Sequence, residues 1–198
     1  MTLALSSTAM AHVTVKPSEA LTASYQTFLV SVPNEKSIPT TSIKVVIPSG
    51  VQSVTPTQKA GWQVTTDKTG TGEDATVTAI TWSGGTINQG TRDEFSFSAK
   101  LPDQATELQW KAYQTYSDGT VVSWDKAGSD DRSHDSEDEN SGPLSVTNVV
   151  TETGATATVN AANQAATDAK KTANWALYTG IAGVAIGLIA VFLATRKK

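Results

Sequence analysis

His12 is the residue of this sequence best suited to bind a transition metal, because of the residues in front of it. Ala9, Met10 and Ala11 form the small-x-small pattern after which signal peptidase cleaves. Cleavage there would leave His12 with a free α-amine and a ring Nδ1 that can chelate one ion. The amine has a reference pKa of about 8, so a metal displaces its proton at little cost, and such nitrogen donors favour Cu(II). The alternative is an exposed residue that merely leads a strand.

The composition excludes most other chemical sites. The chain has 198 residues, no cysteine and two histidines, His12 and His134. Thiolate metal sites, disulfides and cysteine nucleophiles are therefore excluded, and sites with several imidazoles nearly so. His134 lies in a charged loop and His12 leads a strand, so neither suggests the general base of a hydrolytic triad, and we expect no catalytic residues and no enzyme. A net charge of −4 without a clustered basic face gives no reason to expect nucleic acid binding.

One acidic segment is a weaker candidate for cation binding. Residues 129–140 read SDDRSHDSEDEN, with six acids around Arg132 and His134. Carboxylates suit hard cations, but the spacing of a calcium loop is absent. The segment is better interpreted as a solvated loop.

The C-terminal end predicts a membrane anchor. Residues 175–195 carry no charge, and at about 1.5 Å per residue they would span the roughly 30 Å hydrocarbon core of a bilayer. Trp175 and Tyr178 suit one interface, and the basic residues 196–198 suit the cytoplasmic side. We therefore expect a single-pass protein of the cell membrane with its N-terminal domain extracellular, as on a Gram-positive cell surface. Gly183 and Gly187 are compatible with helix pairing, which leaves the oligomeric state open.

The remaining segments divide the chain around one domain. Residues 1–11 are interpreted as the last part of a signal peptide, with a true start codon farther upstream. Residues 12–150 form the folded domain. Residues 151–174 are rich in alanine and threonine, bury too little to fold alone, and are predicted to be a linker that holds the domain away from the membrane.

Residues 12–150 show the patterns of strands rather than helices. Apolar residues alternate with polar ones in several short runs, and turn-forming residues separate them. Eight or nine strands at this spacing predict an all-β fold, an antiparallel β-sandwich of immunoglobulin-like or cupredoxin-like type, followed by the linker and one transmembrane helix. The main alternating runs are Val13/Val15, Phe28/Val30/Val32, Ile43/Val45/Ile47 and Phe95/Phe97/Ala99.

One hairpin is predicted at residue level. Asp118-Gly119 is a favoured pair for a two-residue type I′ turn. Counting outward from this turn places Tyr113 opposite Trp124 on one face of the hairpin, with Trp110 and Tyr116 on the other. Both faces carry aromatic residues, so either could be the core.

Several motifs together resemble the YcnI family of bacterial copper-binding proteins. The resemblance covers about residues 12–150 and implies an exported β-sandwich, often with a C-terminal membrane helix and an association with copper transport. The motifs that carry the resemblance are residues 12–19 (HVTVKPSE), 32–36 (VPNEK), 47–51 (IPSGV), 61–62 (GW), 110–114 (WKAYQ), 118–119 (DG) and 123–124 (SW).

The resemblance also implies a Cu(II) site called a monohistidine brace, made by an N-terminal histidine, a carboxylate and a tryptophan. By position, His12 matches the histidine and Trp124 the tryptophan. Glu35 is the first choice for the carboxylate, since it follows a strand where a turn could direct it to the sheet edge. Glu19 is the second choice, because it lies so near His12 in sequence that it needs a tight chain reversal. An indole has no anionic ligand atom, so Trp124 is expected to shield the ion or offer its π face.

Two functions follow as expectations. The first is a membrane-anchored extracellular protein that binds Cu(II) and sequesters it or exchanges it with a copper transporter or chaperone in the same membrane. The alternative is a cell-surface structural or adhesion module without metal. The state of the N-terminus separates the two, because a mature chain that begins elsewhere than His12 has no such chelate.

Overall fold

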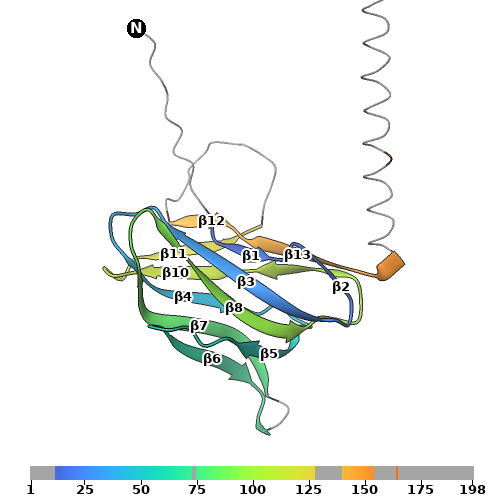
Figure 1. The fold of residues 1–198 in the computed structure, drawn as a ribbon. Helices are drawn as coiled ribbons and strands as arrows, with labels where there is room; N and C mark the ends of the chain where they lie inside the picture. Colours follow the sequence, from blue (N-terminus) through green and yellow to red (C-terminus); the bar gives the residue numbers. More distant parts are fainter. Residues whose placement is uncertain (1–11, 73–74, 128–139, 154–163, 165–198) are drawn as a thin grey trace, which may run out of the picture. The chain divides into compact units, whose positions relative to one another are not determined.

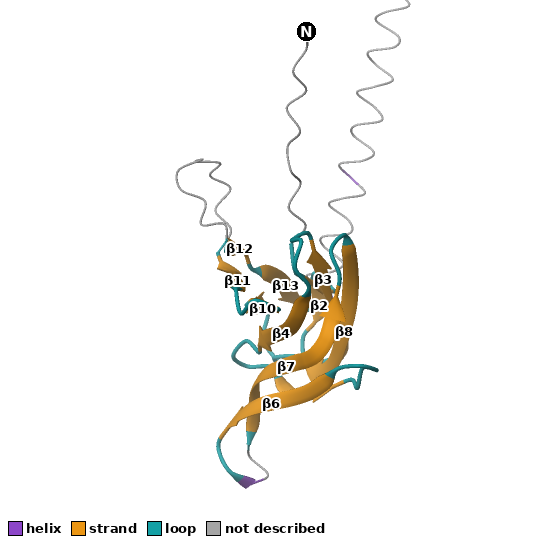
Figure 2. Ribbon diagram, turned by 90° about the vertical axis from the view of Figure 1, so that its left-hand side faces the viewer, coloured by secondary structure: helices purple, strands orange, loops and turns teal. Residues whose placement is uncertain are grey.

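The computed structural model describes residues 12–72, 75–127, 140–153 and 164. The chain divides into two compact units, Met1–Thr151 and Glu152–Lys198. The described part of the first unit is an all-β sandwich (Figures 1 and 2), which confirms the sandwich part of the predicted fold class. Of the second unit, the structure describes only residues 152–153 and 164, which have helical backbone conformation.

Thirteen strands make up the described part of the sandwich, more than the eight or nine predicted, because several of them are short strands of three to five residues. The strands are β1 Thr14–Lys16, β2 Glu19–Leu21, β3 Tyr25–Asn34, β4 Thr40–Val46, β5 Gln52–Pro56, β6 Gln63–Thr69, β7 Thr76–Ile87, β8 Thr91–Lys100, β9 Thr106–Trp110, β10 Ala112–Tyr116, β11 Val121–Lys126, β12 Ser141–Pro143 and β13 Ser145–Val150.

These strands form three hydrogen-bonded sheets. Their orders are β1-β3-β8-β5, β12-β11-β10-β4-β7-β6 and β2-β13-β9. Only Lys111 separates β9 from β10 and only Leu144 separates β12 from β13, so the last two sheets share two nearly continuous chain segments. Most pairings are antiparallel, as predicted, but β11 with β12 and β13 with β2 are parallel. The first strand, β1, pairs with β3 alone in its sheet and is an edge strand.

The predicted alternating runs supply the core. In each run the apolar members are buried between the sheets, which confirms the sequence interpretation. Trp110, fully buried, donates its indole N–H to Thr147 Oγ1 at 3.0 Å. Other buried members include Val13, Val15, Phe28, Val30, Val32, Ile43, Val45, Phe95, Phe97 and Ala99.

Several predicted segments lie outside the described residues. They are the signal remnant 1–11, nearly all of the acidic segment 129–140, most of the linker 151–174, the anchor 175–195 and the tail 196–198. Within the part of the chain that is described, no helix has the length and apolar character to cross a membrane.

The predicted register of the β10–β11 hairpin is wrong by one residue. The structure pairs Ala112 with Trp124 and Tyr113 with Ser123. The Tyr116 N–H donates to the Thr120 carbonyl at 2.9 Å, and Gly119 has a left-handed φ of 86°. The loop therefore has three residues rather than two, a type in which glycine takes the last, left-handed position. As a result Trp124 faces the core on the same side as Tyr116, not with Tyr113.

Asp118 stabilises this loop through its carboxylate. Asp118 Oδ1 accepts from the Thr120 backbone N–H and Oδ2 from the Thr120 hydroxyl, both at 2.9 Å. These hydrogen bonds, the backbone one foremost, hold the pKa of Asp118 below its ordinary value of 3.8. A lowered pKa means that the carboxylate contributes stability above that value and loses it as the pH falls through the pKa of the folded protein.

We expect an NMR titration of the Asp118 carboxyl to give a midpoint below 3.8, with the Thr120 amide shifting in step. Thr120→Val should raise the midpoint in part, because it removes the hydroxyl donor and keeps the amide donor. A midpoint at or above 3.8 in the unaltered protein would contradict this account of the loop.

Candidate functional site

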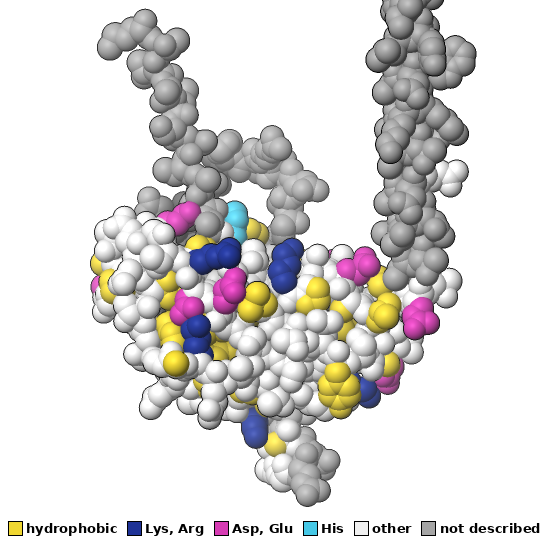
Figure 3. All heavy atoms as spheres, in the orientation of Figure 1, with side chains coloured by type: hydrophobic (Ala, Val, Ile, Leu, Met, Phe, Trp, Pro, Cys, Tyr) yellow, Lys and Arg dark blue, Asp and Glu magenta, His cyan; other side chains and the backbone are white. Residues whose placement is uncertain are grey.

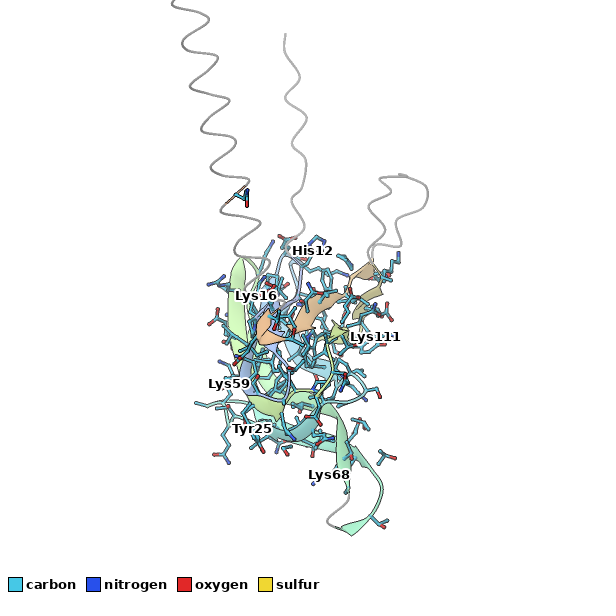
Figure 4. All side chains as sticks on the ribbon, turned by 90° about the vertical axis from the view of Figure 1, so that its right-hand side faces the viewer. His12, Lys16, Tyr25, Lys59, Lys68 and Lys111 are labelled. Atoms are coloured by element: carbon cyan, nitrogen blue, oxygen red, sulfur yellow. The ribbon has the colours of Figure 1, made fainter. Side chains whose placement is uncertain are left out.

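His12 lies at the surface, just before edge strand β1, at the end of the domain where the chain enters (Figures 3 and 4). Strand β1 is antiparallel to β3, with Thr14 opposite Ser31 and Lys16 opposite Leu29. Continuing this register toward the N-terminus brings His12 opposite the end of β3. The buried side chains of Val13 and Val15 hold this short segment against the core.

The ring of His12 packs against Trp124. The two ring centroids are 5.5 Å apart and the ring planes are perpendicular. Trp124 itself is only 4% exposed, so it belongs to the core and also forms the surface on which His12 lies. Trp124 is therefore a core residue that can also serve as a site residue.

Gly142 makes room for the Trp124 ring. It lies on β12, directly opposite Trp124 in the parallel β11–β12 pairing. A Cβ atom at Gly142 would overlap Cε3 and Cζ3 of the indole. The absence of a side chain at this position thus determines where the six-membered ring of Trp124 can lie.

Gln114 holds the opposite edge of the same indole. The Trp124 Nε1–H donates to Gln114 Oε1 at 3.2 Å. The Gln114 amide nitrogen donates in turn to the Pro33 carbonyl at 2.9 Å and to Thr40 Oγ1 at 2.7 Å. Gln114 is completely buried, so its hydrogen bonds are formed away from water. Neither Gly142 nor Gln114 was identified from sequence, although Gln114 lies within one of the motifs that carry the family resemblance.

The turn between β3 and β4 carries Glu35. Asn34, which is buried, accepts from the Lys36 N–H through Oδ1 and donates through Nδ2 to the carbonyls of Ile38 and Ile87. The side chain of Glu35 is exposed. Glu35 therefore follows directly on the end of β3 that the β1 register places opposite His12.

Tyr116 lies beside this turn on the inner face of β10. The pKa of Tyr116 is raised, chiefly by burial and additionally by the negative charge of Glu35. Lys36 Nζ lies 5.0 Å from the centroid of the Tyr116 ring and donates to Asn140 Oδ1 at 3.0 Å. The turn therefore places the negative charge of Glu35 and the positive charge of Lys36 near Tyr116.

Glu19 lies elsewhere. It begins β2 and pairs with Asn148 of β13. Between His12 and Glu19 the chain continues past β1 in one direction: Val15 N–H donates to Ser145 Oγ at 2.9 Å and Asn148 N–H to the Ser18 carbonyl at 2.8 Å. The chain therefore runs from β1 into β2 alongside β13, which carries Glu19 away from the His12 end of β1. The structure thus brings the rings of His12 and Trp124 together, places Glu35 just past the end of β3, and places Glu19 on β2 beside Asn148 of β13.

Among the residues that the structure describes, no three or more His, Cys, Asp or Glu side chains gather as a ready-made metal site. An ion bound at His12 would therefore need donors besides such side chains. The α-amine that cleavage after Ala11 would expose is a donor of this kind.

The fold and the His12–Trp124 contact together define a class of protein. It is an immunoglobulin-like sandwich in which a surface histidine packs on a core tryptophan at one end. Residues 12–146 match the model of a family described as a domain of unknown function, DUF1775, and the chain belongs to this family. The family resemblance drawn from sequence is thereby confirmed.

One relative and one solved structure agree with the family and the fold. "Copper-binding protein CutI" of Bacillus subtilis (strain 168) is 40% identical over 118 residues, which cover 59% of this chain and 56% of that protein. The match thus spans little more than half of that relative's length. An uncharacterized protein from Nocardia farcinica, described as having an immunoglobulin-like fold, is 26% identical with a TM-score of 0.58 and covers 71% of this chain and 99% of its own. A cohesin module from Clostridium perfringens ATCC13124 superposes with a TM-score of 0.43 at 10% identity, over 69% and 94% of the two chains.

Proposed function

We propose that this protein binds Cu(II) at His12 and serves copper sequestration or trafficking at the outer side of the cell membrane. The observation that carries the proposal is the packing of the exposed His12 ring on Trp124, at the end of the sandwich that also carries the Glu35 turn. The name of the Bacillus relative and the start of the family match at residue 12 support it. We propose binding rather than catalysis, because the groups available at His12 and Glu35 would act as ligands of an ion.

The donors near His12 suit Cu(II). After cleavage at Ala11, the α-amine and ring Nδ1 of His12 would bind one ion together, and the Glu35 carboxylate would offset part of its charge. Trp124 would cover one side with an apolar ring and limit the access of water. Two nitrogens and a carboxylate oxygen form a set that needs no cysteine, which agrees with the composition.

The setting of the site is part of the same proposal. The predicted signal remnant, linker and anchor would place residues 12–150 outside the cell on a stalk. A copper transporter or chaperone in the same membrane is the partner that this location favours. Export is also the step that would create the free amine of His12, so localisation and metal binding depend on one cleavage.

The proposal is tested by titrating Cu(II) into the chain that begins at His12, with calorimetry for affinity and EPR for nitrogen ligation. Mass spectrometry of the protein recovered from cells establishes where the mature chain begins. A mature start at another residue, or no Cu(II) binding by the chain that begins at His12, would sink the proposal and favour the adhesion module.

The two candidate carboxylates give a matched pair of variants. Glu35→Gln is expected to weaken Cu(II) binding by about tenfold, because it removes a charged donor at the His12 end of β3. Glu19→Gln should change the affinity by less than about twofold, since Glu19 lies on β2 beside Asn148. The same titrations measure both. A stronger loss from Glu19→Gln than from Glu35→Gln would reverse the assignment.

A further inference from the structure

Gln114 has a buried polar side chain that forms three hydrogen bonds around the candidate site. Its partners are Trp124, Pro33 and Thr40. The indole N–H of Trp124 can only donate, and the Pro33 carbonyl can only accept. The amide oxygen of Gln114 must therefore face Trp124 and its nitrogen must face Pro33, as the structure has it. The chemistry of the partners thus permits one orientation of this amide.

The two acceptors of the Gln114 amide nitrogen flank one turn. Pro33 lies near the end of β3 and Thr40 begins β4, so a single NH2 group connects both ends of the segment that carries Glu35. The amide oxygen meanwhile holds the indole on which His12 packs. Gln114 therefore connects the two parts of the candidate site that come from different segments of the chain.

We propose that Gln114 is the positioning residue of this site: it fixes the Trp124 indole beneath His12 and the Glu35 turn beside it, and so sets the space that an ion at His12 would occupy. The part of this inference that concerns a bound ion rests on the proposed function. The positioning of the Trp124 indole and the Glu35 turn depends only on contacts within the chain. A glutamine serves this purpose because it donates twice and accepts once without burying a charge.

The test is Gln114→Met in the full chain beginning at His12, with Thr147→Val as the matched control. Methionine has a similar volume and forms none of the three hydrogen bonds. Thr147→Val also removes the partner of a buried indole N–H, that of Trp110, together with a bond to the Pro17 carbonyl. Both variants should lose stability in urea, but only Gln114→Met alters the candidate site.

Two readouts separate positioning from a structural role. The first needs no metal: NMR with ¹⁵N-labelled tryptophan, in which Trp124→Phe assigns the Trp124 indole peak. We expect Gln114→Met to shift this peak and to abolish the NOE between the His12 and Trp124 rings, while Thr147→Val leaves both unchanged. The second is Cu(II) titration, in which Gln114→Met should weaken binding by about tenfold and change the EPR spectrum.

The outcomes distinguish the two proposals. If the unaltered chain does not bind Cu(II) while the NMR changes occur as expected, the positioning role holds and the proposed function fails. If Gln114→Met keeps the NOE between the His12 and Trp124 rings, the Cu(II) affinity and the EPR spectrum of the unaltered chain, the positioning role is overturned. Should Gln114→Met fail to fold, Thr40→Val removes one of the two clamps on the turn. Thr40→Val should then change the NMR peak, the NOE and the Cu(II) affinity in the direction expected for Gln114→Met, but by less. Unchanged NMR and EPR spectra would overturn the positioning role of Gln114.

Discussion

Replacing His12 with alanine is expected to weaken Cu(II) binding by at least about 100-fold, equivalent to about 2.8 kcal/mol. Alanine keeps the α-amine but removes the imidazole nitrogen, so the chelate is lost. A single extra residue before His12 should have a similar effect for the opposite reason, because it keeps the imidazole and turns the amine into an amide. Calorimetry gives the affinity, and the nitrogen hyperfine pattern in EPR reports which donors remain.

The matched control for this result is His134→Ala, which removes the other histidine of the chain. It should leave both the affinity and the EPR spectrum unchanged. If His12→Ala bound Cu(II) as tightly as the unaltered chain, the His12 chelate would be wrong and the acidic segment 129–140 would become the candidate site.

Gly142→Ala is expected to lower the free energy of unfolding by about 1–3 kcal/mol and to displace the Trp124 ring from His12. Its added Cβ would overlap the indole, whereas the backbone of Gly142 has no left-handed φ that would forbid alanine. The steric cost therefore falls on Trp124. Thermal unfolding measures the loss, which should lower Tm by about 2–4 °C per kcal/mol for a chain of this size.

Gly85→Ala provides a control with the same kind of clash. There the added Cβ would overlap the ring of Trp62, which packs on Phe95 instead of on His12. Both variants should lose stability, and only Gly142→Ala should also remove the contact between the His12 and Trp124 rings. Equal effects of the two variants on that contact would mean that Gly142 has no particular relation to the site.

Sequence patterns predicted the core of this domain well, because alternation reports directly on which face of a strand is buried. Val30 and Phe97 are examples, both completely buried as their runs indicate. The same patterns cannot fix the length of a loop. Asp118-Gly119 fits a two-residue turn and equally a three-residue loop with glycine last, and the hydrogen bonds of Asp118 with Thr120 accompany the second. That difference of one residue places Trp124 on the same face as Tyr116, which is the core face, instead of on the face of Tyr113.

The candidate site was predictable only in part, for a related reason. His12 and Trp124 could be named from motifs, and Glu35 could be preferred to Glu19 from its place after a strand. The packing of Trp124 on Gly142 depends on a parallel pairing between β11 and β12, which no local pattern indicates. The role of Gln114 depends on three segments that are distant in sequence, and in sequence it is only a polar residue within a strand.

Strand β1 is an edge strand of three residues, yet Val13 and Val15 are 2% and 1% exposed. Burial of two valine side chains is worth about 3–6 kcal/mol before the entropy of ordering the segment is counted. His12 is therefore attached to the body of the domain by this burial, by the short β1–β3 pairing and by the hydrogen bonds between Val15 and Ser145. Peeling away β1 is a smaller event than global unfolding, and it would separate His12 from Trp124 while the rest of the sandwich stays intact. Under the proposed function, such local opening would uncover an ion bound at His12 without unfolding the rest of the domain.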